Sequence, residues 1–237
     1  IVSGIGLIIT SPFLLIGMIA VWLQDRHSPF YIASRVSKGD GIFKMVKLRS
    51  MIINADKNKV DSTSADDCRI TSVGKFIRRY KLDEIPQLWN VFIGDMSMVG
   101  PRPNVKRDTD LYTDEEKRLL SVRPGVTDLA SIVFSDEGDI LNGSSDPDLD
   151  YNQLIRPWKS RLGLICIDNS SVLLDINIII LTAIAILDKQ KALLGVNRLL
   201  KKLGADDELI SAALRNKPLI PTPPPGSSFV VQSREAN

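Results

Sequence analysis

The sequence is poor in the residues on which many enzymes depend. Its 237 residues include one histidine, His27, and two cysteines, Cys68 and Cys166, which lie far apart and outside any CxxC spacing. This pattern argues against a zinc site, a redox pair and a Ser-His-Asp or Cys-His mechanism, and it fits a reducing compartment. A net charge of +2 gives no indication of nucleic-acid binding. We therefore expect carboxylate chemistry and no nucleic-acid partner.

Nucleotide-binding signatures are also missing. Gly4 and Gly6 lack the third glycine of a dinucleotide fingerprint, and no GxxxxGK[ST] sequence occurs. Any nucleotide must therefore be held by another arrangement.

Charge is absent from the N-terminal segment 1–23, which is almost entirely apolar. One straight helix of this length reaches about 34 Å, enough to cross the hydrocarbon core of a bilayer. Pro12 at its middle removes a backbone donor, and the Ser11 hydroxyl can satisfy the freed carbonyl. The physics of the segment alone favours a spanning helix over a re-entrant one, with a kinked span or an uncleaved signal sequence as further alternatives.

The next segments predict a hairpin followed by a loop and a helix. Residues 29–32 and 43–48 read as two strands around a turn at 38–41, and residues 54–72 are polar enough for a mobile loop. A helical period follows, carried by Ile85, Leu88, Trp89 and Phe92, with Pro86 in its first turn. Asp83 or Glu84 is therefore expected at the N-cap of this helix.

The second half predicts further helices. Thr113 and Glu116 have the spacing of a capping box for a short helix at 113–122, and the acidic stretch 136–150 reads as a solvated loop. Residues 176–187 suit a core or interfacial helix, because twelve apolar residues are too few to span a bilayer. Residues 188–203 predict a basic amphipathic helix, either on an anionic membrane or packed on its own domain.

The densest group of charges lies at 74–87, where four cations precede Asp83 and Glu84. A helix N-terminus favours negative charge, so we expect Asp83 to be ionised and able to attack an electrophilic phosphorus. Glu84 is a suitable oxygen ligand for Mg²⁺. The alternative is an ordinary N-cap aspartate followed by a glutamate in the first turn of a helix.

Four ordered segments resemble the motifs of the bacterial sugar transferases, the monotopic phosphoglycosyl transferases that begin glycan assembly on undecaprenyl phosphate. They are KLRSM at 47–51, LDEIPQLWNV at 82–91, GDMSMVGPRP at 94–103 and RPGVT at 123–127, and the resemblance covers roughly residues 1–187. It implies that Asp83 is the nucleophile that forms a phosphoglycosyl-aspartate and expels UMP, and that Glu84 holds the cofactor Mg²⁺. It also implies a set of basic side chains near the phosphates: Lys47, Arg49, Arg78, Arg102 and Arg123.

The resemblance also bears on topology and partners. The family's membrane helix breaks at a Ser-Pro, matched by Ser11 and Pro12, and returns to the cytoplasmic face of the bacterial inner membrane, which reverses the preference for a spanning helix. The implied partners are a UDP-sugar, polyprenyl phosphate and membrane lipid, while a homodimer stays open. A glycosyltransferase that releases UDP, and a non-catalytic scaffold of the same fold, are the competing functions.

The predicted fold is α/β, mostly helical with a small β-hairpin. It comprises a re-entrant membrane helix at 1–23, a cytoplasmic catalytic domain with interfacial amphipathic helices at 24–187, amphipathic helices at 188–216 and a disordered proline-rich tail at 217–237.

The sequence departs from the family pattern at several points. Asp128 follows Thr127 where many members have glycine, which leaves the donor sugar open. Asp175 resembles a family acidic position and is expected to be an N-cap. The basic residues that usually begin family members are not found before Ile1, so a truncated start is expected.

Overall fold

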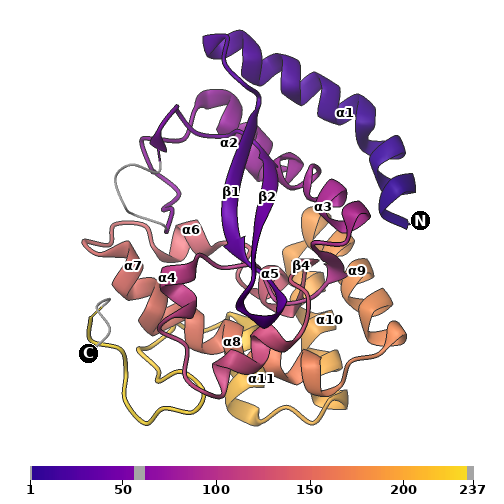
Figure 1. Ribbon diagram of the computed structural model, residues 1–237. Coiled ribbons are helices and arrows are strands. Elements are labelled where there is room, and N and C mark those ends of the chain that lie inside the picture. The colour runs from indigo at the N-terminus through magenta and orange to yellow at the C-terminus, as the bar shows by residue number, and fades with distance from the viewer. Residues whose placement is uncertain (1, 56–61, 234–237) are drawn as a thin grey trace.

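The computed structural model describes residues 2–55 and 62–233, and within them the chain is mostly helical with two small sheets. A long helix, α1 (Val2–Asp25), lies along one end of the molecule, and the helices of the second half form the other end (Figure 1). The hairpin connects these two parts. The mobile loop expected at 54–72 falls partly outside the described residues.

The expected hairpin is confirmed. β1 (Phe30–Val36) pairs antiparallel with β2 (Ile42–Leu48), with Phe30 opposite Leu48 and Val36 opposite Ile42. The first strand runs four residues beyond its predicted end, because pairing with β2 extends it through a polar stretch that has little strand signal of its own. The turn η1 (Lys38–Asp40) places Gly39 at a φ of 67°, which glycine adopts without strain.

A second sheet was not predicted. β3 (Ser97–Val99) and β4 (Gly125–Thr127) form a short parallel pair in which Ser97 lies opposite Gly125. Strands of three residues are too short to show a period, and the prolines around them indicate a loop. Pairing between segments distant in sequence, rather than local propensity, forms this sheet.

The expected helices are present with shifted bounds. Thr113 and Glu116 form the predicted capping box, since each backbone N–H donates to the side chain of the other residue, but the helix that follows, η4 (Glu116–Ser121), is a 3-10 helix. The remaining elements are α2 (Ser72–Arg79), η3 (Leu82–Glu84), α3 (Gln87–Ile93), α4 (Lys106–Thr109), α5 (Leu129–Val133), α6 (Glu137–Ile140), α7 (Pro147–Asp150), η5 (Tyr151–Ile155), α8 (Arg156–Asp168), α9 (Val172–Leu187), α10 (Lys189–Lys202) and α11 (Asp207–Leu214).

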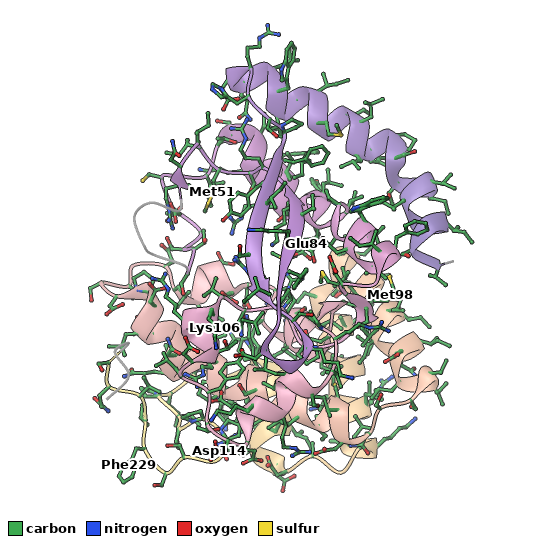
Figure 2. All side chains as sticks on the ribbon, in the orientation of Figure 1. Met51, Glu84, Met98, Lys106, Asp114 and Phe229 are labelled. Carbon is green, nitrogen blue, oxygen red and sulfur yellow. The ribbon has the colours of Figure 1, made fainter. Side chains whose placement is uncertain are left out.

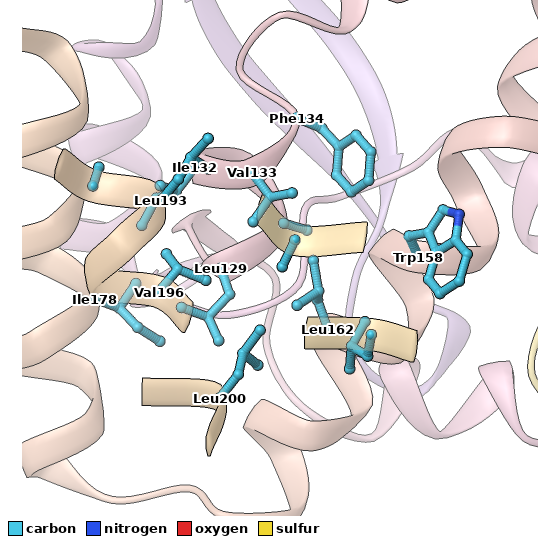
Figure 3. Packing of buried hydrophobic residues seen from close by; sticks show 14 of the residues in the cluster. Leu129, Ile132, Val133, Phe134, Trp158, Leu162, Ile178, Leu193, Val196 and Leu200 are labelled. Carbon is cyan, nitrogen blue, oxygen red and sulfur yellow. The ribbon is translucent and has the colours of Figure 1, made fainter. Parts of the chain in front are cut away.

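The largest core lies among the helices of the second half. Leu129 of α5, Trp158 of α8, Ile178 of α9 and Val196 of α10 converge there (Figure 3). Burying one such side chain stabilises the fold by about 1.5–3 kcal/mol. Because α5 follows β4 directly, this core holds the small parallel sheet in place.

Helix α1 packs against the domain along much of its length. Val21 is fully buried with Leu48 and Ile77, and Leu14 and Met18 pack at the edge of the same cluster. The helix runs through Pro12 without interruption, so the expected break is not seen. The Ser11 hydroxyl donates to the Ile8 carbonyl at 2.8 Å, which is the carbonyl that Pro12 leaves without a donor.

Three further expectations are corrected. The acidic stretch 136–150 forms α6 and α7 rather than a loop, and Asp136 in it pairs with Lys189 at 2.7 Å. The N-cap of α9 is Ser171, whose hydroxyl accepts from the Leu174 nitrogen, so Asp175 does not cap it.

The tail is the third correction, because residues 217–233 lie against the domain, with a turn at 225–226, while the last part of the predicted tail, 234–237, is outside the described residues. The Thr222 nitrogen donates to the Gln153 carbonyl at 3.0 Å, and the Thr113 hydroxyl donates to the Pro225 carbonyl. Proline fixes φ in advance, so ordering this segment costs less entropy than its composition suggested.

Candidate active site

The two candidate carboxylates lie in a turn between α2 and α3. Lys81 takes a left-handed conformation with a φ of 56°, and Leu82–Glu84 then form one 3-10 turn. Pro86 caps α3, so neither carboxylate is the N-cap that the sequence predicted. The difference arises because the left-handed residue redirects the chain and starts a separate turn before α3 begins.

Glu84 is held by two cations. Arg102 Nη2 lies 2.6 Å from Oε1 and Arg102 Nη1 lies 3.2 Å from Oε2, while Lys47 Nζ lies 3.8 Å from Oε1. Burial alone would raise the pKa of Glu84, but the charges of Arg102 and Lys47 outweigh it and lower the pKa to about 2. Glu84 is therefore ionised throughout the neutral range. Figure 2 shows it beside the hairpin, near the centre of the molecule.

Asp83 is in a different state from its neighbour. Its side chain is buried, and Oδ1 has no hydrogen-bond partner among the described residues. Burial raises the pKa of Asp83, with the Lys47 charge opposing the shift and the Glu84 charge adding to it. The sequence led us to expect a carboxylate favoured by a helix dipole, but desolvation is the larger effect here.

Arg102 reaches Glu84 from the loop after β3. Its Nη1 also donates to the Val126 carbonyl of β4 at 2.7 Å. The small sheet therefore orients the guanidinium toward Glu84. The two strands approach closely only because Gly100 and Gly125 face each other: a Cβ on Gly125 would lie 2.1 Å from the Gly100 nitrogen. Glycine is therefore required in the segment that places Arg102.

Lys47 comes from β2 and completes the cationic side of the site. It contacts Glu84 and contributes charge at Asp83, while burial lowers the pKa of Lys47 itself. Lys47 and Arg102 are the two predicted basic residues that the structure brings to the carboxylates.

Arg49 is not at the site. Its guanidinium is bidentate to Asp25 at 2.5 and 2.7 Å, and its Nε donates to the Ser28 carbonyl at 2.9 Å. It therefore joins the end of α1 to the hairpin, because side chains two residues apart on a strand are separated along it and Lys47 already occupies the position beside η3.

Arg78 and Arg123 form no hydrogen bond or ion pair with either carboxylate within residues 2–55 and 62–233. Arg78 lies in the last turn of α2, and its charge acts on Asp83 through space. Arg123 lies in the turn before β4, where its backbone carbonyl accepts from the Ser97 hydroxyl at 3.5 Å. Their predicted roles in binding substrate stay predictions.

Two charged residues near the site were missed as functional candidates. Lys81 acts electrostatically on both Asp83 and Glu84, and its only signal was membership of the cation-rich stretch. Asp128 caps α5 by accepting from the Ser131 nitrogen at 2.6 Å, and burial raises its pKa while the Arg102 charge opposes this. The sequence singled out Asp128 only as a departure from the family pattern.

Comparison with known proteins then decides the family. The sequence model of the family described as "Bacterial sugar transferase" matches residues 1–189, which is most of the chain. The chain belongs to this family. The apolar helix α1 of this sugar transferase is the one helix, among the described residues, with the length and composition to cross a membrane.

Curated relatives of this sugar transferase have related names. It is 35% identical over 187 residues to the UDP-glucose:undecaprenyl-phosphate glucose-1-phosphate transferase of Klebsiella pneumoniae, covering 77% of this chain and 37% of the relative. Identity to the galactosyl transferase CpsE of Streptococcus agalactiae is 35% over 185 residues, covering 71% and 38%. For the undecaprenyl-phosphate galactose phosphotransferase of Salmonella typhimurium it is 34% over 170 residues, covering 64% and 33%. The chain thus spans well under half the length of these three relatives.

Proposed function

We propose that this chain transfers a sugar-1-phosphate from a UDP-sugar to undecaprenyl phosphate and releases UMP, as the first membrane step of glycan assembly. The observation that carries the proposal is the pair of adjacent buried carboxylates, in which Glu84 is held by cations and Asp83 keeps an oxygen without a partner. The names of the relatives supply the substrate classes, since they are called undecaprenyl-phosphate sugar-phosphate transferases.

In the first step an oxygen of Asp83 attacks the phosphorus that carries the sugar. A bond forms between that oxygen and phosphorus, and the bond from phosphorus to the bridging oxygen breaks, so UMP leaves with the electron pair. Lys47 and Arg102 lie close enough to the carboxylates to neutralise phosphate oxygens that would otherwise repel Asp83. The product on the enzyme is a phosphoglycosyl-aspartate.

In the second step a phosphate oxygen of undecaprenyl phosphate attacks the same phosphorus. The bond to Asp83 breaks, the carboxylate is regenerated, and the lipid carries the sugar diphosphate away. A covalent intermediate divides one displacement between two bulky substrates into two simpler ones. The site therefore needs to bind the nucleotide and the lipid phosphate in turn rather than together.

Magnesium fits the site by the chemistry of its donors. Glu84 offers hard oxygens and is ionised throughout the neutral range, and the carboxylate of Asp83 is adjacent to it in the same turn. Mg²⁺ is usually bound through one or two carboxylates together with substrate phosphates, so this pair of carboxylates is a sufficient protein contribution. Bound Mg²⁺ would neutralise phosphate charge. Glu84 would hold the ion.

The packing of α1 supports the main consequence of a re-entrant topology, that both ends of the helix stay on the cytoplasmic face of the inner membrane, although the break expected at Pro12 is not seen. A Cβ on Gly4 would lie 3.3 Å from the Phe92 ring of α3, and one on Gly17 would lie 2.8 Å from Leu48 of β2. Both halves of the helix therefore touch the same domain. A straight helix that crossed the bilayer would carry its first half out of reach of a domain on the other side.

The remaining apolar surface supports contact with lipid. Trp89 and Phe92 of α3 are exposed, as are Ile176 and Ile180 of α9. Next to Ile180, Arg198 and other α10 residues line a hollow of about 190 Å³. Apolar side chains beside exposed cations suit the boundary between acyl chains and anionic headgroups.

Identifying the nucleotide product tests the proposal. The purified chain is incubated with Mg²⁺, undecaprenyl phosphate and a panel of UDP-sugars, and the nucleotides are separated and quantified. The proposal expects UMP in equal amount to the lipid-linked product. Release of UDP would identify the glycosyltransferase that moves sugar alone, and no nucleotide release with any donor would favour a scaffold.

A further inference from the structure

Gln87 is an unexplained polar residue in the interior. It is the first residue of α3 and is fully buried, yet neither its Nε2 nor its Oε1 has a hydrogen-bond partner among the described residues. A buried polar group without a partner costs about 1–3 kcal/mol. A leucine or methionine would fill this position without that cost, so stability alone does not account for a glutamine here.

The backbone places Gln87 on the same face as the nucleophile. Asp83, Gln87 and Asn90 stand at positions i, i+4 and i+7 of the nearly continuous helical stretch η3–α3, and all three are buried. Residues with this spacing share one side of a helix. Asp83 Oδ1 is a second buried polar atom without a partner, four residues before Gln87.

The buried face of η3–α3 that carries Asp83, Gln87 and Asn90 packs toward strand β2. Asn90 Oδ1 accepts from the Val46 nitrogen at 2.9 Å, and Asn90 Nδ2 donates to the Lys44 carbonyl at 2.8 Å. Lys47, the next residue of the same strand, acts electrostatically on Asp83. Gln87 therefore lies between a structural amide that is fully bonded and the carboxylate that attacks.

We propose that Gln87 is a positioning residue for Asp83, an inference that rests on the proposed function. In the complex with donor, the Gln87 amide donates to the buried Oδ1 and holds the carboxylate so that Oδ2 faces phosphorus. As Oδ2 bonds to phosphorus, Oδ1 becomes the carbonyl oxygen of the mixed anhydride and keeps the same hydrogen bond. No proton passes through Gln87.

A neutral amide suits this task better than a cation. A guanidinium or ammonium bonded to Asp83 would stabilise its negative charge and reduce its reactivity as a nucleophile, as Arg102 does at Glu84. An amide fixes the direction of the carboxylate with less loss of reactivity. The ion pairs of the site fit this view, because Arg102 and Lys47 pair with Glu84 and no cation is bonded to Asp83 Oδ1 among the described residues.

The test compares Gln87→Leu with Asn90→Leu, two replacements of buried amides on one face of α3. For Gln87→Leu we expect a melting temperature equal to or above that of the unchanged chain, because two unpaired polar atoms are removed. We expect kcat and the single-turnover rate of adduct formation to fall about tenfold to a hundredfold, with KM for the UDP-sugar changed by less than about twofold. Asn90→Leu should instead lower the melting temperature.

Gln87→Met, which keeps the length of the side chain, should repeat this result if leucine fits poorly. Wild-type kcat in Gln87→Met, or loss of kcat only together with loss of melting temperature, would overturn the inference. If the unchanged chain itself releases no UMP, the proposed function has failed; if it does and Gln87→Met matches it, the positioning role alone has failed.

Discussion

Arg102 Nη2 lies 2.6 Å from Glu84 Oε1 while its Nη1 lies 3.2 Å from Oε2, so the guanidinium meets both oxygens of one carboxylate. Lysine presents a point charge and does not reproduce this fork. We expect Arg102→Lys to lower kcat/KM by about tenfold or more, which corresponds to about 1.4 kcal/mol of transition-state stabilisation. Arg118→Lys is the matched control, because Arg118 is exposed and pairs with exposed Asp168. Equal values of kcat/KM in the two variants would show that the Arg102 fork contributes nothing to catalysis.

The raised pKa of Asp83 predicts the acid limb of the pH profile. A carboxyl group whose pKa is raised stays protonated, and so loses its nucleophilic form, at a higher pH than an ordinary aspartate near 3.9. Turnover should therefore fall as the pH drops through a value above that range, while Glu84, with a pKa of about 2, stays ionised.

Replacing Lys47 provides a check on this assignment. Lys47 lowers the pKa of Asp83, so Lys47→Met should move the acid limb of kcat to higher pH. The two profiles are measured upward from about pH 4, near the ordinary aspartate value, at constant ionic strength. An acid limb at or below the ordinary aspartate range would contradict the assignment.

The two facing glycines predict a large effect of a small substitution. Gly125→Ala would place a Cβ 2.1 Å from the Gly100 nitrogen, so β3 and β4 must separate. We expect a loss of about 1–3 kcal/mol in the free energy of unfolding, together with loss of turnover as Arg102 moves. Gly41→Ala is the control, because its Cβ would meet Lys38 at an ordinary 3.5 Å. Thermal unfolding of both variants decides the matter, and equal stability would contradict this packing.

Local patterns sufficed to predict the hairpin, the capping box at Thr113 and the helices α3, α9 and α10, because each depends on residues close together in sequence. They did not predict α8, and they gave a loop where α6 and α7 form. The pairing of Glu84 with Arg102 joins residues eighteen positions apart, and no local signal contains it. Family motifs placed both residues at the site, but the pairing itself was not predicted.

The differences between prediction and structure also arise from contacts between residues that are distant in sequence. Arg49 was expected beside the carboxylates, but its guanidinium pairs with Asp25, and its predicted role in binding substrate stays a prediction. The dipole argument for Asp83 omitted burial, which depends on how α1, β2 and α3 come together. The strands β3 and β4 are too short to be recognised before their pairing is known.

The re-entrant topology predicts where both ends of α1 lie. Cysteines are introduced one at a time at Val2, which is exposed, and at Gln24 near the other end of the helix, with Cys68 and Cys166 replaced by serine. Neither cysteine should react with a membrane-impermeant maleimide in intact cells, and both should react after lysis. Labelling of position 2 in intact cells would show that the helix spans.

The covalent state of Asp83 tests the central claim most directly. The chain is incubated with Mg²⁺ and its UDP-sugar but without undecaprenyl phosphate, quenched in acid and digested, and the peptides are measured by mass spectrometry. We expect the mass of one sugar-phosphate on the peptide that contains Asp83, lost on adding undecaprenyl phosphate and absent from Asp83→Asn. Turnover by Asp83→Asn at the rate of the unchanged chain, or an adduct located on another residue, would contradict the account.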